Sequence, residues 1–396
     1  MAGQPGDGPL KIALVAGEAS GDQLGGKLIR ALRERVPDVS CFGVGGDHMR
    51  AAGFDAWWDR RELSVMGLFE VARHLPRLLR LRRALLGRLL EARPDVVVGI
   101  DAPDFNLGLE KRLKQQGLKT VHYVSPTVWA WREGRAAKIG AAADLVLCLF
   151  PFEPPFYANH GVRAAYTGHP MADAIDNDPD RASARRALGL AEDPEADGRP
   201  LVALLPGSRT SEVGRLAAPM LDAAERLAGR PGGARFVAAL ADESTAELFR
   251  ASLANMRGID CRIVTGRALD VMAASDVVVC ASGTATLETL LVNRPMVVTY
   301  RLAASTYQMA KSFKLIKTRF IALPNILADE GLVPELIQDD ASGENIAREV
   351  ARWLDDATAR ERLRERFSAM HAELRCGAAD RAAAAVLDLI RPEGND

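Results

Sequence analysis

The hydrophobic positions of this chain form short continuous runs that alternate with longer segments of helical spacing. The runs are rich in β-branched residues, which is typical of strands covered by helices on both faces. Those of the first half are KIALVAG from Lys11, VSCFGVGG from Val39, DVVVGID from Asp95, KTVHYVS from Lys119 and DLVLCLF from Asp144. The predicted helices between them span 21–36, 65–92 and 131–143. This alternation predicts a parallel, doubly wound α/β sheet.

A polar stretch divides the pattern in two. Residues 173–200 are rich in Asp, Pro and Gly, which indicates a connection with one short helix near 181–188. A second series of strands follows it: LVALLPGS from Leu201, ARFVAAL from Ala234, CRIVTG from Cys261, DVVVCAS from Asp276 and PMVVTYR from Pro295. We therefore expect two similar α/β domains, 8–173 and 174–375. Residues 376–396 are expected to form a terminal helix, and whether it packs on the first domain or on a partner chain stays open.

The composition narrows the class of protein. A chain of 396 residues exceeds one ordinary core, and its formal charge of -1 argues against a nucleic-acid binder. The five cysteines are scattered without a CxxC pair, so neither a disulfide framework nor a zinc site is indicated. The N-terminus lacks the order of a signal peptide, and no run of roughly 18 apolar residues occurs. We expect a cytoplasmic protein without a membrane span.

No metal or cofactor is expected. The six histidines show no HxxxH or HExxH spacing. The DNDPD segment at Asp176 contains the Asp-x-Asp pattern of metal-dependent glycosyltransferases, but it lies in the polar connection and not at a strand end. We interpret it as a solvated loop.

The glycine-rich segment 16–28 follows the first strand and nearly spells a phosphate loop. Leu28 stands where a Mg²⁺-binding Ser or Thr is required, so a nucleoside triphosphatase is not indicated. Two interpretations stay open: a turn that allows tight packing, or a ligand contact in which Ser20 and Gly21 line a substrate cleft.

The segment VVVGIDAPDFN, from Val96, brings a carboxylate to a strand end. Asp101 follows the apolar run, and Pro103 forces a turn that keeps Asp104 and Asn106 nearby. A carboxylate at the mouth of a hydrophobic strand suits a general base that acts on an alcohol. The alternative is that Asp101 caps the next helix, although Asp104 is better placed for that.

Two tryptophans follow another strand end, in HYVSPTVWAW from His122. Each indole needs a polar partner when it is buried, so Trp129 and Trp131 are expected to form a wall against a sugar or an acyl chain. Ser125, at the end of the same strand, is assigned to the same cleft. A packed corner between helix and sheet is the alternative.

Two motifs of the second domain indicate a nucleotide site. LLPGSR places Gly207, Ser208 and Arg209 between a strand and a helix, where backbone amides and a guanidinium can hold a diphosphate without metal. SGTATLE repeats the arrangement at the next strand end. Its first turn, with Ser282, Gly283 and Thr284, can hold phosphate, and Glu288 can reach a ribose diol. An ordinary capped helix remains the alternative for each motif.

Residues 64–93 form a basic amphipathic segment. Seven arginines and one glutamate occur between Val71 and Arg93, opposite a face of leucines. Such a helix suits docking on an anionic bilayer surface, whereas the alternative is a helix that covers the sheet with solvated arginines. The residues expected to face the membrane are Val65, Met66, Leu68, Phe69, Arg77, Arg80 and Arg83.

These motifs occur in the order of a known family. GEASGD, FGVGG, SVMGLFEV, GIDAPDFN, HYVSPTVWAW, GHPMAD, LLPGSR, ASGTATLE and LPN follow one another between Lys11 and Asn325, and RCGAADRAA extends the match weakly. Together they resemble lipid-A-disaccharide synthase, a family of inverting GT-B glycosyltransferases. GIDAPDFN and HYVSPTVWAW are the most specific of these motifs.

The resemblance implies two facing Rossmann-like domains with a cleft between them. It implies UDP-2,3-diacylglucosamine as donor, 2,3-diacylglucosamine 1-phosphate (lipid X) as acceptor, and a metal-independent enzyme that is peripheral to an anionic inner-membrane surface. Asp101 would be the catalytic base, and Arg209 and Asn325 would also be functional, Asn325 at the UDP site. A homodimer stays open.

Two rival functions fit part of these motifs. A UDP-sugar 2-epimerase shares the two domains and the nucleotide site but needs neither a lipid contact nor a second sugar. A peripheral lipid-binding protein would account for residues 64–93 but not for Arg209 and Glu288.

Overall fold

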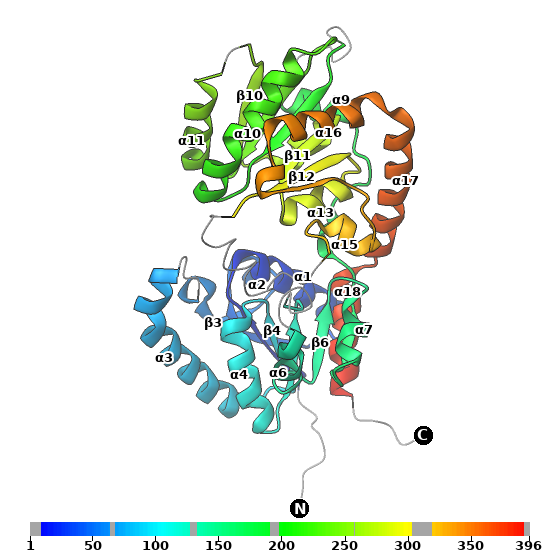
Figure 1. The fold of residues 1–396 in the computed structure, drawn as a ribbon. Helices are drawn as coiled ribbons and strands as arrows, with labels where there is room; N and C mark the ends of the chain where they lie inside the picture. Colours follow the sequence, from blue (N-terminus) through cyan, green and yellow to red (C-terminus); the bar gives the residue numbers. More distant parts are fainter. Residues whose placement is uncertain are drawn as a thin grey trace, which may run out of the picture. The chain divides into compact units, whose positions relative to one another are not determined.

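Two parallel β-sheets organise the computed structural model, which describes residues 9–63, 68–126, 133–190, 198–256, 258–302 and 319–391, with only the backbone for 68–75 and 133 (Figure 1). The first sheet contains β1 Lys11–Ala16, β2 Ser40–Gly45, β3 Asp55–Asp59, β4 Val96–Ile100, β5 Lys119–Tyr123, β6 Leu145–Cys148 and β7 Ala164–Tyr166. The second contains β8 Leu201–Leu205, β9 Arg235–Leu240, β10 Cys261–Thr265, β11 Val277–Ala281, β12 Met296–Tyr300 and β13 Glu335–Ile337.

Helices connect the strands. Those of the first half are α1 Ala19–Arg35, α2 Asp47–Ala51, α3 Leu68–Ala92, α4 Pro103–Gln115, α6 Ala136–Gly140, α7 Glu153–Ala158 and α8 Pro170–Ala174. Those of the second half are α9 Arg181–Ala187, α10 Thr210–Ala228, α11 Glu243–Leu253, α12 Ala268–Ala274, α13 Thr284–Leu291, α15 Leu323–Ala328, α16 Gly343–Asp355, α17 Ala357–Leu374 and α18 Ala378–Ile390. Three 3-10 turns, η1 Arg60–Glu62, η2 Glu133–Arg135 and η3 Gln338–Asp340, complete these elements.

The chain divides into two compact units. Unit 1 comprises Met1–Asp173 and Leu374–Asp396, and unit 2 comprises Ala174–Glu373. The strand order is β3-β2-β1-β4-β5-β6-β7 in unit 1 and β10-β9-β8-β11-β12-β13 in unit 2, and every pairing is parallel. Each unit is therefore a doubly wound, Rossmann-like domain, which confirms the predicted fold class.

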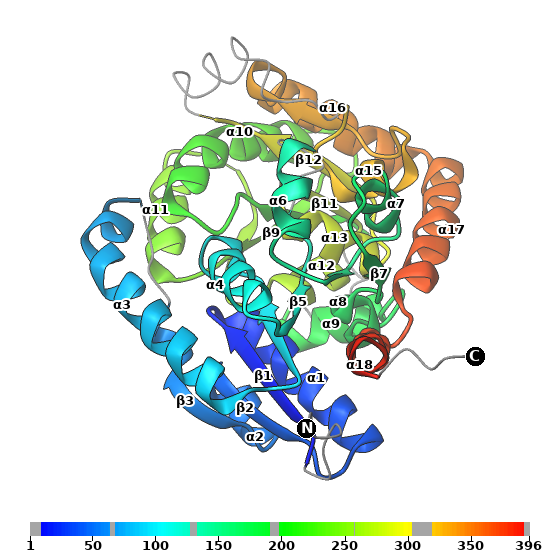
Figure 2. The same cartoon turned by 90° about the horizontal axis from the view of Figure 1, so that it is seen from below.

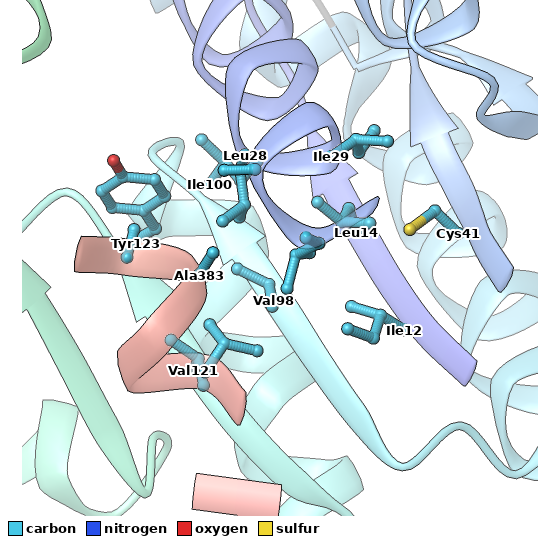
Figure 3. Packing of buried hydrophobic residues seen from close by; sticks show 14 of the residues in the cluster. Ile12, Leu14, Leu28, Ile29, Cys41, Val98, Ile100, Val121, Tyr123 and Ala383 are labelled. Atoms are coloured by element: carbon cyan, nitrogen blue, oxygen red, sulfur yellow. The ribbon is translucent and has the colours of Figure 1, made fainter. Parts of the chain in front are cut away.

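Alternate residues of the unit 1 strands enter two separate cores. Ile12 and Leu14 of β1 pack in a cluster with α1 and α18, whereas Ala13 and Val15 pack with α3 and α4 (Figure 2). Figure 3 shows the first cluster, in which Ala383 of α18 lies among side chains of β1, β4 and β5. Because both faces of the sheet are covered, continuous apolar strands are favoured over alternating ones.

Both ends of α18 are fixed within unit 1. The carboxylate of Asp173 accepts hydrogen bonds from the amides of Gly377 (3.0 Å) and Ala378 (2.7 Å) at the start of this helix. At its other end, Lys119 Nζ donates to the carbonyl oxygens of Leu389 (2.7 Å) and Ile390 (3.2 Å). An anion at the N-terminus and a cation at the C-terminus both stabilise a helix. In the structure this helix therefore lies against the first domain of its own chain.

The predicted strand runs match β1, β2, β4, β5, β6 and β8 to β12. β3, β7 and β13 were not predicted. β3 has the sequence DAWWD, in which an aspartate at each end leaves only a short apolar run, and β7 and β13 have only 3 residues each. The predicted helix at 131–143 is shorter in the described residues, where it consists of η2 followed by α6.

Candidate active site

The candidate residues lie at the carboxyl ends of the strands in both units. β1 and β4 are neighbours in unit 1 at the point where the strand order reverses, and β8 and β11 occupy the same position in unit 2. Ligands of open α/β sheets bind outside the strand ends at such a switch point. Asp101 follows β4, and the segments 207–209 and 282–284 follow β8 and β11.

The connection from β4 to α4 has a strained backbone. Asp101 and Ala102 have φ values of 52° and 44°, a left-handed conformation that costs roughly 1–2 kcal/mol for a residue with a Cβ. At the end of the neighbouring β5, Val124 has a φ of 80°, which is rare for a β-branched residue. The amide of Asp101 donates to the carbonyl oxygen of Tyr123 at 2.8 Å. Strain of this kind is concentrated at functional sites, and the half-buried Asp101 lies within it.

Asn106 holds this connection from below. Its side chain is 1% exposed, and Nδ2 donates to the carbonyl oxygens of Asp101 (2.8 Å), Val15 (3.2 Å) and Ile100 (3.3 Å). These bonds join the ends of β1 and β4 to α4. The amide of Asn106 therefore positions the backbone of Asp101 from inside the protein. The expectation that Asn106, like Asp104, also belongs to the acceptor and sugar cleft stays a prediction.

A buried carboxylate–imidazole pair lies next to Asn106 and was not predicted. Gly99 of β4 is in register with His122 of β5, and a Cβ on Gly99 would lie 2.0 Å from Glu110 Oε1. Because glycine leaves this space open, Glu110 on α4 reaches His122, with 2.8 Å between Oε1 and Nδ1. Burial raises the pKa of Glu110, and the adjacent His122 opposes that shift. The pair joins α4 to the sheet directly beneath Asp101.

The glycine-rich turn after β1 allows close packing. Gly21 is buried, and a Cβ there would touch Ile100, while a Cβ on Gly26 would lie 2.7 Å from the carbonyl oxygen of His48. Gly21 therefore has a packing role in this structure, and its assignment to the substrate cleft stays a prediction. Ser20, one residue earlier in the first turn of α1, is exposed.

Asp22 explains the last residue of the GEASGD motif. It is 1% exposed, and its carboxylate accepts hydrogen bonds from the amides of Gly46 (2.8 Å), His48 (3.1 Å) and Met49 (3.1 Å). The carboxylate therefore holds the start of α2 against α1, which is a structural role that the sequence did not indicate.

The other predicted cleft residues of unit 1 differ in their surroundings. Asp104 is exposed in the first turn of α4. Ser125 is 6% exposed, and its hydroxyl is 2.9 Å from the hydroxyl of Tyr157, while its assignment to the cleft stays a prediction. Trp129 and Trp131 lie outside the described residues.

A pocket of about 430 Å³ lies at the carboxyl edge of the unit 2 sheet. Its lining includes the predicted nucleotide residues Gly207, Ser208, Arg209, Ser282, Gly283, Thr284 and Glu288. The pocket therefore brings the two strand-end motifs of this domain to one space. Leu240 and Ala241 at the end of β9 and Tyr300 at the end of β12 widen it.

The two helix starts at this pocket are not equivalent. Glu212 Oε2 accepts hydrogen bonds from the amides of Ser208 (3.0 Å) and Arg209 (3.3 Å), so a carboxylate already occupies these donors. These two amides are therefore not free in this structure, and their role in binding a diphosphate stays a prediction. Glu212 also lies 3.5 Å from the guanidinium of Arg209, whose side chain is 79% exposed. Arg209 is thus held loosely beside the pocket.

At the start of α13, no side chain of the described residues occupies the first backbone amides as Glu212 does at α10. Gly283, with a φ of 152°, precedes the helix, and Thr284 and Ala285 of its first turn line the pocket. One turn later, burial raises the pKa of Glu288, because its carboxylate loses water without gaining a hydrogen bond or ion pair in the described part of the chain. A helix N-terminus suits an anion, and an uncompensated carboxylate suits hydroxyl donors.

Asn325 is connected to the pocket through other residues. It is 1% exposed, and its amide bonds to Glu335 (2.8 Å) and to both backbone groups of Val333 (2.9 Å each). Glu335 in turn accepts from the amide of Ile321 (3.0 Å), whose carbonyl oxygen accepts from the hydroxyl of Ser282 (2.9 Å). Asn325 is not among the described residues that line the pocket, and its predicted place at the UDP site stays a prediction.

The basic helix α3 covers the sheet with its later turns. Leu85 and Leu89 are fully buried in the core, whereas Arg77, Arg80 and Arg83 are exposed. Arg77 forms an ion pair of 3.0 Å with Glu62. Val65 and Met66 lie outside the described residues, as do the side chains of Leu68 and Phe69. Within the described ranges, no helix is both long and apolar enough to cross a membrane.

No three His, Cys, Asp or Glu side chains of the described residues gather in a way that suits a metal ion.

Comparison with known proteins identifies the family. A family model described as lipid-A-disaccharide synthetase matches residues 12–386. The lipid-A-disaccharide synthase of Xanthomonas campestris pv. campestris (strain 8004) is 51% identical over 392 residues, which cover 96% of this chain and 86% of that protein. That of Pseudomonas aeruginosa (strain UCBPP-PA14) is 50% identical over 381 residues, which cover 96% of this chain and 98% of that protein.

Solved structures of low sequence identity share the fold. The UDP-GlcNAc 2-epimerase of Neisseria meningitidis has a TM-score of 0.62 at 12% sequence identity. The match covers 96% of this chain and 100% of the epimerase chain. The calicheamicin glycosyltransferase has a TM-score of 0.57 at 16% sequence identity, and the match covers 96% of this chain and 98% of that glycosyltransferase chain. These matches show the GT-B fold. From the family model and the close relatives, the chain belongs to the lipid-A-disaccharide synthase family, whose members are glycosyltransferases.

Proposed function

We propose that this enzyme transfers 2,3-diacylglucosamine from UDP-2,3-diacylglucosamine to the 6-hydroxyl of lipid X with inversion at the anomeric carbon. Asp101 takes the proton of the attacking hydroxyl, the new glycosidic bond forms as the bond to the UDP oxygen breaks, and UDP leaves. The products are the disaccharide 1-phosphate and UDP. No metal is needed in this proposal.

The observation that carries the proposal is the placement of Asp101. A carboxylate at the switch point of a doubly wound sheet is where a ligand is expected. The left-handed backbone at Asp101 and Ala102 is held by the amide of Asn106, so the backbone that carries the carboxylate is held in position before the substrate binds. A base that needs no reorientation contributes more to the rate than a mobile one.

The pocket of unit 2 supports the UDP part of the proposal. As the donor bond breaks, negative charge grows on the diphosphate. The first turn of α13 and the guanidinium of Arg209 are the groups that would receive this charge. Glu288 would accept hydrogen bonds from the ribose hydroxyls. Asn325 would act indirectly, through Glu335, Ile321 and Ser282.

The test compares UDP release with donor alone and with donor plus lipid X. Release only when both are present supports the transferase, whereas release or sugar conversion with donor alone would favour the epimerase alternative. Asp101→Asn, which keeps the shape of the side chain, is expected to lower kcat by about 10²–10⁴-fold with little change in UDP affinity. A folded Asp101→Asn variant with wild-type turnover would exclude Asp101 as the base.

The membrane part of the proposal is tested separately. Acyl chains are costly to remove from a bilayer, at about 0.8 kcal/mol per CH₂, so the enzyme is expected to dock on the anionic inner-membrane surface. Reversing the exposed Arg80 and Arg83 to Glu should reduce sedimentation with anionic vesicles and leave binding to neutral vesicles unchanged. Equal sedimentation of the variant and the wild type with anionic vesicles would remove this part of α3 from the interface.

A further inference from the structure

A second pocket lies in unit 1 beside Asp101. It has a volume of about 630 Å³ and is formed by α4, by α6 and by Pro126 after β5. Its apolar lining is Pro103, Leu107, Pro126, Ala137, Ile139 and Ala141. Three cations stand around this apolar surface, Lys111, Arg135 and Lys138, and Asp104 is the single acidic residue of the lining.

The three cations are not paired with any residue that the structure describes. Lys111, Arg135 and Lys138 are exposed, and none has a hydrogen bond or ion pair among the residues that the structure describes. Lys114, one turn along the same helix, is the contrast: its Nζ lies 2.9 Å from a carboxylate oxygen of Asp144 and bonds to two carbonyl oxygens. α4 therefore uses one lysine to hold the fold and presents another to the pocket.

The pocket begins next to the proposed base. Pro103 and Asp104, which line it, directly follow the strained residues Asp101 and Ala102. A molecule whose reacting hydroxyl lies at Asp101 can therefore extend along the exposed face of α4 into this pocket. An apolar lining suits hydrocarbon, and clustered Lys and Arg suit phosphate. A ligand that fills such a site carries both groups.

We propose that this pocket is the acceptor subsite, which binds an acylated sugar phosphate. An acyl chain would lie on Leu107, Ile139 and the prolines, and the phosphate would bind Lys111, Arg135 and Lys138. The inference rests on the proposed function, because it takes Asp101 as the base and an acylated sugar phosphate as the acceptor. It adds the residues that recognise the acceptor's phosphate and its chain.

The first experiment removes the charge. In steady-state assays at saturating donor, Lys111→Ala is expected to raise the KM for 2,3-diacylglucosamine 1-phosphate roughly fivefold, and Lys111→Ala/Lys138→Ala about tenfold or more, at nearly unchanged kcat. Arg112→Ala is the matched control, because Arg112 is the exposed neighbour of Lys111 and does not line the pocket. Its KM should stay within about twofold of wild type, since an isolated surface charge contributes little.

The second experiment separates phosphate from chain. With an acceptor that lacks the phosphate, the lysine variants should equal the wild type, whereas equal losses for both acceptors would overturn the phosphate assignment. Ala137→Trp fills the pocket from an exposed position and should weaken both acceptors without changing UDP affinity. If both Ala137→Trp and the double lysine variant keep the wild-type acceptor KM, the subsite is wrong although the transferase stands. Absence of wild-type UDP release would instead reject the proposed function itself.

Discussion

Both sheets have loops with a positive φ at the switch point, but the residues with positive φ after β4 carry side chains, whereas those after β8 and β11 are glycines. Asp101 and Ala102 have φ values of 52° and 44°, and Gly207 and Gly283 have φ values of 113° and 152°. In unit 1 the unusual backbone is imposed on Asp and Ala by hydrogen bonds from Asn106. In unit 2 glycine adopts it with little strain.

The difference follows from what each loop has to present. If Asp101 is the base, as proposed, its carboxylate must be fixed relative to the hydroxyl that it deprotonates, and a strained loop held by Asn106 serves that purpose. A diphosphate at the start of α13, as proposed for unit 2, would be bound by backbone amides that must approach it closely, which favours a residue without a side chain such as Gly283. On the proposed function, each unit would use the same strand end for a different kind of contact.

Of the changes considered, removal of the Asn106 side chain, which holds the loop after β4, should have the largest effect on stability and kcat. Asn106→Ala deletes the amide that bonds to Val15, Ile100 and Asp101. The loss of these buried bonds is expected to lower the free energy of unfolding by about 2–3 kcal/mol and to reduce kcat, while UDP affinity stays unchanged. Urea unfolding, steady-state kinetics and UDP titration measure these quantities.

Asn325→Ala is the matched control in unit 2, because it also removes a buried amide that clamps a loop. It should weaken UDP binding, through the loss of support for Ser282. If Asn106→Ala and Asn325→Ala altered UDP affinity equally, the assignment of separate roles to the two loops would be wrong.

Gly207→Ala and Ala102→Gly should change the free energy of unfolding in opposite directions. Gly207→Ala forces a Cβ into a φ of 113° and within 2.4 Å of Glu212 Oε2, so a loss of about 1–2 kcal/mol is expected. Ala102→Gly relieves a left-handed alanine and should raise the free energy of unfolding by about 0.5–1 kcal/mol.

The Ala102→Gly variant should also turn over more slowly, since the freed loop no longer fixes Asp101. Urea denaturation and kcat are measured on the same samples. A stability loss in Ala102→Gly would show that the backbone at this position is not strained.

The smallest expected effect is the pH dependence that His169 gives to the free energy of unfolding. Burial lowers the pKa of His169 to about 4, and Asp173 opposes the shift. An unfolded imidazole titrates near pH 6.5, so between these values the unfolded state binds more protons. This contribution to stability is therefore complete above about pH 6.5 and is lost as the pH falls toward about 4, by about 1 kcal/mol at pH 5.5.

Urea unfolding of the wild type and His169→Gln at pH 7.5 and 5.5 tests this prediction. The variant should lose less stability between the two pH values than the wild type. Parallel losses would indicate that His169 does not carry the pH dependence of unit 1.

The strands that could be predicted from sequence are those whose burial on both faces requires a continuous apolar run, such as β4 and β11. β3 could not, because its aspartates break the pattern and its pairing with β2 is visible only in three dimensions. Asp101 was predictable because chemistry at a parallel strand end follows the end of an apolar run.

The residues that support the site were harder to predict. Asn106 and Ser125 are polar residues near strand ends, where sequence cannot distinguish a ligand contact from an internal hydrogen bond. Glu212 lies within one helical turn of the amides that it occupies, and the S-R-x-x-E spacing of a capping box could have revealed it. Glu110 and His122 form a pair only because Gly99 leaves space between them.

The packing of α18 on unit 1 of its own chain has a consequence for synthesis of the protein. Unit 2 is an insertion, since Asp173 and Leu374 flank it and both belong to unit 1. When translation reaches residue 373, unit 2 is complete, yet Ile12 and Val121 of unit 1 still lack the helix that covers them. Unit 1 therefore has one segment synthesised before unit 2 and another synthesised after it. Nascent unit 1 carries an uncovered apolar face until the final helix docks, and this interval is when the growing polypeptide most needs protection from aggregation.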